Sequence, residues 1–399
     1  MNVHTPPNHR NDFEVAMICA LPLEYDAATL IFDEFWDEDG DHLGRAVGDN
    51  NTYATGRIGC HNVVLALLPN MGKVGAAGTT AALRSSFPRA RLAVLTGICG
   101  GVPYHGDGIE VCLGDVIISR TVVQYDLGRQ YPGKFVRKDT IHDNLSRPNH
   151  DIRSLLDTFQ TEFGLARLQR GALSALNSIQ SNATETGRRT SYHPPALVED
   201  HLFKPTYLHV HRDRSNCDCS ATEACEVAES ASCDEISCDY QHSIPRKRLG
   251  SLQKQVTRVF VGDVASGDTV MKSGEHRDNL AKELGVIALE MEGAGVWDQI
   301  PCIVVKGVCD YADSHKNKVW QPFAAAAAAS VTKALLSRYT QTDKPESSRA
   351  VEKDGTDAAA PRSANSGAGQ QFNNTGSGTQ NNNSGDGRQY NAQTMNFKD

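Results

Sequence analysis

Two carboxylates one residue apart, Glu290 and Glu292, stand where an apolar run of this sequence ends. Residues 287–289 predict a buried strand, and the small residues 293–295 predict a tight turn into a helix. A buried carboxylate is costly without a partner, so each of the two should bind something. In an extended backbone they would face opposite sides, which lets one reach a pocket while the other has another role. The alternative is a strand end with solvated acids.

Other residues that could do chemistry also follow apolar runs. They are Glu24 after residues 13–22, Gly97 within 92–102, Asp268 within 257–271 and Asp310 at the end of 301–310. Ligands of α/β sheets bind at the carboxyl ends of the strands. We therefore expect these residues, with Glu290 and Glu292, to meet at one edge of a sheet.

The elements that would position these residues alternate between strands and helices. Beyond the runs already named, we expect a hairpin, two further strand segments and four helices: 57–68; 114–119 and 122–128; 23–30, 79–85, 152–163 and 323–339. This alternation predicts an α/β fold whose mostly parallel sheet has helices on both faces. A glycine-rich turn, residues 69–78, precedes the second helix and suits an anion or close ligand approach, although its spacing fits neither a dinucleotide fingerprint nor a P-loop.

Composition excludes several classes of protein. The chain has 399 residues, 40 basic and 48 acidic, with a net charge of −8, which argues against a protein that coats nucleic acid. Residues 1–12 are polar, and the apolar runs are far shorter than the roughly 20 residues of a membrane span. We expect a soluble, cytoplasmic protein whose 11 cysteines are thiols.

Residues 166–250 are weakly patterned and contain five cysteines: Cys217, Cys219, Cys225, Cys233 and Cys238. Their spacing differs from the regular pairs of zinc modules, so we expect a flexible, polar insert without metal. The neighbouring His209 and His211 keep a metal site as the alternative.

The domain boundaries follow from composition. We expect a disordered N-terminus at 1–12, one domain over 13–340 that includes the insert, and a charged, disordered linker at 341–365. Residues 366–399 are rich in Asn, Gln and Gly, and the similar pentapeptides Gly-Gln-Gln-Phe-Asn and Gly-Arg-Gln-Tyr-Asn begin at residues 369 and 387. Such repeats suit stacked cross-β structure, with a generic low-complexity linker as the alternative.

Seven short motifs together resemble the purine nucleoside phosphorylase and methylthioadenosine nucleosidase superfamily, in family order over residues 13–339. They are Ala20-Leu-Pro-Leu-Glu24, Met71-Gly-Lys-Val74, Thr96-Gly-Ile-Cys-Gly-Gly101, Leu113-Gly-Asp-Val116, Ser266-Gly-Asp268, Glu290-Met-Glu292 and Cys309-Asp310-Tyr-Ala-Asp313. The resemblance implies an α/β/α sandwich around a mixed, mostly parallel sheet.

The resemblance also implies roles for individual residues. Asp310 matches the general acid that protonates the leaving purine at N7, and Glu24 matches the acid that activates water. Glu292 matches the residue that grips the ribose hydroxyls, with Met291 under the sugar; Glu290 is more readily structural. Further substrate-binding residues are expected at Met71, Gly72, Gly97, Asp268, Val270 and Met271. No cofactor and no metal are implied.

Water is the expected nucleophile. Related phosphorylases hold phosphate with a Gly-Asp-Pro turn and an arginine, where this chain has Leu21-Pro-Leu-Glu24. The runs Val122-Val-Gln-Tyr-Asp-Leu-Gly128 and Val270-Met-Lys272 most resemble the phosphorylase-like domains of fungal NOD-like immune receptors, and some immune relatives cleave ATP. Arg129, Lys134, Arg137 and Lys138 follow a strand whose loop lies beside the ribose 5′ side in the nucleosidases, and they would suit a polyphosphate. We therefore expect ATP to be favoured over methylthioadenosine, with a nucleoside phosphorylase and a solvated basic loop as alternatives.

The tail resembles the sigma-type amyloid signalling motif of fungal incompatibility proteins. That resemblance implies a NOD-like receptor as partner and a defence or cell-death output. We also expect homo-oligomers. The competing interpretation is a catalytically dead scaffold, although Glu24, Glu292 and Asp310 are all present.

Overall fold

The computed structural model describes residues 5–340 except 107, 141, 213–216, 218, 220–222, 224 and 251–256. The predicted linker and amyloid motif, 341–399, lie outside the described residues. Of the expected disordered N-terminus, residues 5–12 are described. Arg10–Asp12 form a 3-10 helix, η1, and the Asp12 carbonyl accepts a hydrogen bond from Asn62 Nδ2 at 3.1 Å, so the prediction of disorder was wrong there.

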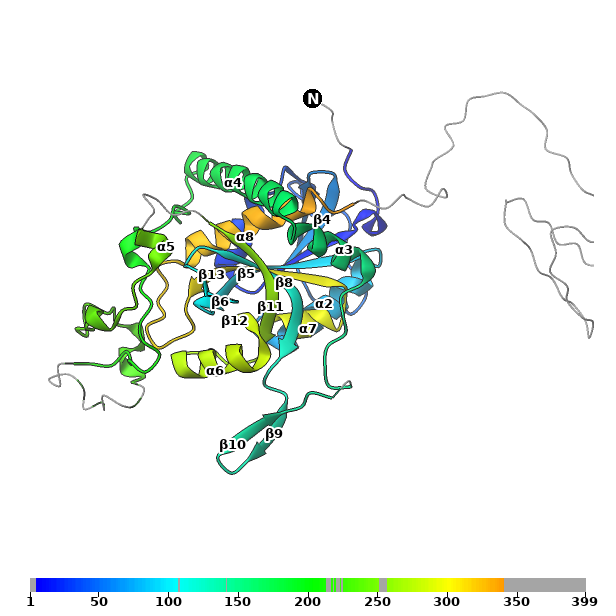
Figure 1. The fold of residues 1–399 in the computed structure, drawn as a ribbon. Coiled ribbons are helices and arrows are strands. Elements are labelled where there is room, and N and C mark those ends of the chain that lie inside the picture. The colour runs from blue at the N-terminus through cyan, green and yellow to red at the C-terminus, as the bar shows by residue number, and fades with distance from the viewer. Residues whose placement is uncertain are drawn as a thin grey trace, which may run out of the picture. The chain divides into compact units, whose positions relative to one another are not determined.

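A nine-stranded mixed sheet forms the centre of the fold (Figure 1). Its order is β12-β11-β8-β13-β5-β1-β4-β3-β2. Parallel pairings join β1 to β4 and β5, β13 to β5, and β11 to β8 and β12, whereas β8–β13, β5–β12 and the β4-β3-β2 edge are antiparallel. The strands are β1 Val15–Cys19, β2 Glu34–Phe35, β3 Tyr53–Ile58, β4 His61–Leu67, β5 Leu92–Gly101, β8 Val116–Gln124, β11 Val259–Ser266, β12 Val286–Glu290 and β13 Cys302–Asp310.

Hydrophobic cores lie on both faces of this sheet, because successive side chains of a strand point to opposite sides. In β1, Val15 and Met17 join one core while Ala16 and Ile18 join the other. The first core is covered by α1 Pro22–Thr29, α3 His150–Phe159, α4 Glu162–Glu185 and α8 Gln321–Leu336; the second by α2 Lys73–Ser86 and α7 Gly293–Trp297. The predicted α/β/α sandwich with a mixed, mostly parallel sheet is confirmed.

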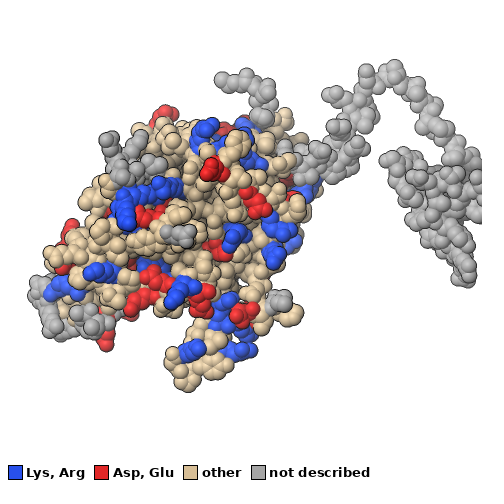
Figure 2. Space-filling view, viewed as in Figure 1, with Lys and Arg blue, Asp and Glu red and all other residues tan. Residues whose placement is uncertain are grey.

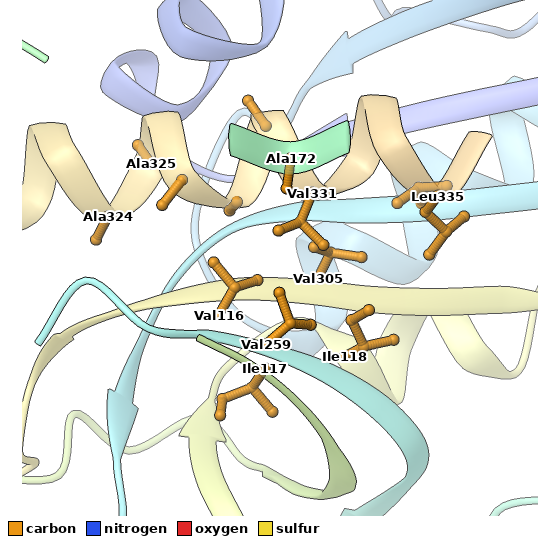
Figure 3. Close-up of a cluster of buried hydrophobic side chains, with 14 of the residues drawn as sticks. Val116, Ile117, Ile118, Ala172, Val259, Val305, Ala324, Ala325, Val331 and Leu335 are labelled. Atoms are coloured by element: carbon orange, nitrogen blue, oxygen red, sulfur yellow. The ribbon is translucent and has the colours of Figure 1, made fainter. Parts of the chain in front are cut away.

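Helix α8 packs unusually close to the sheet. Its alanines 324–329 are fully buried over β13 and β5. Figure 3 shows Ala324, Ala325 and Val331 packed above Val305 and the neighbouring strands. A Cβ placed on Gly307 would lie 2.0 Å from the Ala324 carbonyl oxygen, so helix and strand touch backbone to backbone. Only small side chains permit this approach.

Three local predictions were wrong. Helix α2 begins at Lys73, not after residue 78, because the glycine turn ends at Gly72, whose φ is 102°. The expected basic loop is a hairpin, β9 Gly128–Tyr131 and β10 Lys134–Arg137. The supposed insert begins with most of the 24-residue helix α4, whose buried residues recur at helical spacing among Ser, Gln and Asn: Leu168, Ala172, Ala175, Leu176, Ile179 and Ala183.

The remaining elements are short, apart from α6 Gly274–Leu284 beside β12. They are β6 Tyr104–His105, β7 Ile109–Glu110, η2 Leu197–Glu199, η3 Val227–Ser230, η4 Tyr240–His242 and α5 Lys247–Gly250. Two arginines fasten the end of the insert to the sheet. Arg248 forms a buried ion pair with Asp115, and Arg246 donates to the Pro103 carbonyl at 3.1 Å.

Among the described residues, none of the helices is both long enough and apolar enough to cross a membrane. Acidic and basic side chains are interspersed on the face shown in Figure 2.

Candidate active site

A cavity of about 470 Å³ opens at the carboxyl ends of the central strands. Its walls come mostly from the last residues of β5, β12 and β13 and from the segments that follow β1, β4, β11, β12 and β13, as expected for ligand sites of open α/β sheets. Seven of the residues predicted from the sequence line it: Glu24, Met71, Val270, Met271, Met291, Glu292 and Asp310. Of the residues expected to meet at one edge of the sheet, Glu24, Glu290, Glu292 and Asp310 line this cavity, so the predicted convergence is confirmed for these four.

Glu24 is held rigidly in the first turn of α1. Its Oε2 accepts hydrogen bonds from the backbone N–H groups of Ala20 at 2.8 Å and Leu21 at 3.0 Å, and its Oε1 accepts from Ile98 at 2.7 Å. Three donors from two strand ends thus fix one carboxylate at the cavity wall. Burial raises the pKa of Glu24, although the ammonium of Lys306 and the backbone donors lower it and Glu292 adds to the rise. A base of raised pKa is better matched to accept a proton near neutral pH.

Glu292 lies at the N-terminus of α7. Its Oε2 accepts from Lys306 Nζ at 3.0 Å, and its Oε1 accepts from the Gly72 N–H at 3.3 Å. Glu290 accepts instead from the backbone N–H groups of Glu292 at 3.0 Å and Gly293 at 2.8 Å. Glu290 thus holds the turn that presents Glu292, in agreement with the structural role expected for it.

Lys306 is the positively charged residue that the glutamates of the site surround. It is fully buried in the middle of β13, with Nζ 3.0 Å from Glu292 and 3.9 Å from Glu290 Oε2. Burial lowers the pKa of Lys306, but the carboxylates of Glu292, Glu24 and Glu290 outweigh it and raise the pKa, so the lysine stays charged. The two acids do not face opposite sides as an extended backbone would require, because β12 ends at Glu290 and the chain turns.

Asp310 is the last residue of β13. Its Oδ1 accepts from the Ala312 N–H at 2.8 Å, while Oδ2 lies 3.3 Å from both the Cys309 thiol and Lys316 Nζ. The carboxyl lines the same cavity as Glu24 and Glu292. A carboxyl group at this position can exchange a proton with a bound ligand.

Three other predicted residues act beside the cavity. A Cβ at Gly97 would lie 2.2 Å from Glu24 Oε1, so this glycine makes room for the carboxylate. Gly72 contributes the N–H that Glu292 accepts. Asp268 is half exposed and its Oδ1 accepts from the Lys73 N–H at 2.8 Å, which places it at the start of α2 and not in the cavity lining.

Arg129 and Lys134 are not brought to the cavity within this chain. Both are exposed on the β9–β10 hairpin, which projects away from the sheet at the bottom of Figure 1. The cavity is lined by other cations, Lys316 and Lys318.

Sequence reasoning missed Lys306, Lys316 and the Ile98 N–H. A lysine between the apolar residues 302–305 and 307–309 was a readable signal, because a buried ammonium needs a carboxylate partner. Nothing in the sequence pointed to the donor at Ile98, since any residue there would supply it.

This chain is similar to several known proteins. Residues 14–199 match the family described as the phosphorylase superfamily, and residues 360–398 match the sigma domain on NACHT-NTPases. A nucleotide-binding leucine-rich repeat (NLR)-like protein of Hyaloscypha variabilis is 32% identical over 84% of this chain, and the chain spans only 30% of that relative. A 5′-methylthioadenosine/S-adenosylhomocysteine nucleosidase of Mycobacterium bovis is 24% identical over 81% of this chain and 95% of its own length.

Two solved structures are also similar. Futalosine hydrolase of Helicobacter pylori is 16% identical, with a TM-score of 0.46 over 82% of this chain and 98% of its own. S-adenosylhomocysteine nucleosidase of Streptococcus pyogenes is 16% identical, with a TM-score of 0.47 over 83% and 98%. The fold assignment follows from the strand order described above.

Proposed function

We propose that this chain, which belongs to the phosphorylase superfamily through residues 14–199 and ends in a sigma domain, hydrolyses the N-ribosidic bond of purine nucleosides or nucleotides. One observation carries the proposal: Glu24, Glu292 and Asp310 come from three separate segments and line one cavity. An acid for the leaving group and a base for water are the pair that glycoside hydrolysis requires.

In the proposed mechanism Glu24 accepts a proton from water as the water oxygen bonds to C1′ of the ribose. The bond from C1′ to the purine nitrogen breaks, and Asp310 gives its proton to N7 so that the base leaves neutral. Glu292, fixed by Lys306, binds the ribose hydroxyls. The carboxylates also stabilise the cationic sugar of the transition state. Transfer of the proton from Glu24 to Asp310 through solvent restores the enzyme.

Water is the proposed nucleophile because the position after the first strand holds a carboxylate. A phosphate ion would meet Glu24, Glu290 and Glu292 there, and like charges disfavour it.

We propose an adenine nucleotide, ATP, as the substrate, on the basis of the basic residues of the β9–β10 hairpin. Because Arg129 and Lys134 stand outside the cavity of one chain, this substrate requires the hairpin of a second copy or the cations at the cavity, Lys316 and Lys318. A methylthioadenosine-type nucleoside is the second candidate. The methionines 71, 271 and 291 in the lining and the similarity to the Mycobacterium bovis nucleosidase favour it.

A nucleotide panel tests the proposal. Wild-type protein should release adenine from ATP without added phosphate, and Asp310→Asn should slow release by about 10² to 10⁴. The matched control is Asp268→Asn, which removes a carboxylate outside the cavity lining. Adenine from methylthioadenosine alone would replace the substrate, and release that requires phosphate would replace the reaction. No base release from any purine would leave the dead-scaffold alternative.

We further propose that the sigma domain couples this enzyme to a NOD-like receptor by amyloid templating, with cell death or defence as the output. Similarity to the NLR-like protein and the Asn/Gln-rich repeats support this role. Deleting residues 362–399 should abolish fibril seeding while leaving base release unchanged, and seeding that survives the deletion would refute it.

A further inference from the structure

We propose that the cysteine-rich insert binds two zinc ions. His211, Cys217, Cys219 and Cys225 would hold the first. His209, Cys233 and Cys238 would hold the second, together with the neighbouring His315. His209 and His211 are two residues apart, so one short segment of the chain would contribute a ligand to each site. The inference is independent of the proposed enzymatic function.

The first cluster already has the dimensions of a tetrahedral zinc site. Its four ligand atoms lie within 4.8 Å of one another. Cys217 Sγ is 3.8 Å from Cys225 Sγ, and His211 Nδ1 is 3.5 Å from Cys225 Sγ and 3.8 Å from Cys219 Sγ. Zinc bonds of about 2.3 Å to sulfur and 2.0–2.1 Å to nitrogen place tetrahedral ligands about 3.8 Å apart for two sulfurs and about 3.6 Å apart for sulfur and nitrogen.

His209 in the second cluster is oriented as a metal ligand. Its Nε2 lies 3.0 Å from the Ala231 carbonyl oxygen and 3.1 Å from that of Ala228, so Nε2 carries the proton. The lone pair of Nδ1 then faces Cys238 Sγ at 3.5 Å and Cys233 Sγ at 3.8 Å. A backbone carbonyl that fixes the second ring nitrogen is the usual support of a zinc-bound histidine.

His315 supplies the fourth ligand. It is only 6% exposed, and neither of its ring nitrogens has a hydrogen-bond partner. Such an unpaired buried group requires an explanation. Its ring centre is 5.3 Å from that of His209, whose Nδ1 faces the Cys238 thiol at 3.5 Å. The nearest carboxylate, Asp313, has its Oδ1 3.9 Å from Nδ1 of His315, too far for a hydrogen bond. A metal ion between the two rings and the thiols would give one of the His315 nitrogens a direct partner.

The donor sets favour zinc over other occupants. Three sulfurs with one nitrogen, and two with two, are typical of structural zinc sites. The sulfurs of Cys217 and Cys225 are 3.8 Å apart, far beyond the roughly 2.05 Å of a disulfide. Zinc binding would release the thiol protons, and the divalent cation would balance the thiolates that result, three at the first site and two at the second.

The second site would also connect the insert to the active site. His315 follows Asp310 in the loop after β13, and the same loop carries Lys316, which is 3.3 Å from Asp310. Asp310, His315 and His209 line one small pocket beside the main cavity. Zinc bound by His315 would therefore fix the loop that follows Asp310, the proposed general acid.

Metal analysis of the full chain tests the proposal. Protein produced with zinc and freed of loose metal should contain about two zinc ions per chain, and X-ray absorption should show mixed sulfur and nitrogen ligands with zinc–sulfur bonds of about 2.3 Å. Cys217→Ser with Cys225→Ser should remove one ion, and Cys233→Ser with His315→Ala should remove the other. Cys60→Ser, an exposed thiol in the β3–β4 turn, is the control and should retain both.

Because the double variants could fail to fold, the wild-type measurements decide on their own. Wild type without bound zinc, or with Cys217 joined to Cys225 in a disulfide by mass spectrometry, would overturn the proposal. Zinc content that both double variants retain would overturn it as well.

Discussion

Replacing Lys306 with methionine should destabilise the protein strongly, because its buried ammonium lies among three buried acids, Glu24, Glu290 and Glu292. Its Nζ is 3.0 Å from Glu292 and 3.9 Å from Glu290, and Lys306 and both acids are at least nine-tenths buried. Removing one partner of a buried ion pair costs about 3–5 kcal/mol, since the other charge is left without compensation. We therefore expect Lys306→Met to lose about 3–5 kcal/mol of unfolding free energy.

The double variant Lys306→Met with Glu292→Gln should recover part of this loss. Its glutamine carries no charge, and its amide oxygen can still accept from the Gly72 N–H. We expect a coupling free energy of about 2–3 kcal/mol between the two positions, which lies in the range for residues that contact each other. Urea unfolding of the wild type, both single variants and the double variant measures this coupling.

Lys333→Met is the matched control. Lys333 lies on α8 and its Nζ is 2.7 Å from Asp33, but both side chains are about one-third exposed. Solvent screens such a pair, so its loss should cost about 1 kcal/mol or less. The reasoning fails if Lys306→Met costs no more than Lys333→Met, or if the effects at 306 and 292 simply add.

Four further predictions have defined outcomes. Gly307→Ala should destabilise by about 1–3 kcal/mol or more in urea unfolding because its Cβ would strike the backbone of α8, whereas Gly78→Ala, with nothing within 4 Å of the new Cβ, should stabilise by up to about 1 kcal/mol. Burial raises the pKa of Glu24 above its usual value of 4.5, and the base must be ionised, so kcat/KM should fall on the acid side at a pH above 4.5; an acid limb at or below 4.5 would contradict this. The same raised pKa means that the folded chain holds the proton of Glu24 more tightly than the unfolded chain does. The contribution of Glu24 to the unfolding free energy is therefore full below pH 4.5 and lost as pH rises through its folded-state pKa. Urea unfolding across pH should show this loss in the wild type and not in Glu24→Gln. Arg248→Met should lower the unfolding free energy by about 3–5 kcal/mol because Asp115 would be left buried without its ion pair, and a loss near zero in the same assay would show that the arginine is dispensable.

The positions of most strands and of the cavity could be predicted because the relevant information is local. Apolar runs ending in Glu24, Glu292 and Asp310 identify strand ends, and parallel strands bring such ends to one edge. Helix α4 was missed because half of its six buried residues are alanines and its other faces are rich in Ser, Gln and Asn, so its apolar residues form a weak pattern. Contacts between segments distant in sequence, such as Glu24 with the Ile98 N–H, leave no local trace.

For the hairpin that carries Arg129, the sequence showed the charge of the residues but not their position relative to the cavity. Its charges were correctly read as a basic cluster, but their distance from the cavity depends on how far β8 extends before the chain turns. The prediction that these residues bind the substrate remains a prediction. In the insert, the irregular spacing of the cysteines argued against a metal site. That argument does not reach ligands that tertiary contacts bring together, such as the proposed ligand His315, because these need not follow a sequence motif.

The hydrogen bonds of Glu24 have a consequence for how relatives of this chain should be compared. This carboxylate accepts from Ala20, Leu21 and Ile98, so it joins the start of α1 to the end of β5 whether or not water is ever activated there. A descendant that had lost catalysis would still be under selection to retain a glutamate at this position, because its loss would leave three buried donors unpaired. A glutamate retained at position 24 in related proteins is thus weak evidence that those proteins are active enzymes. Asp310, which accepts only one backbone N–H, is the more informative residue to follow through evolution.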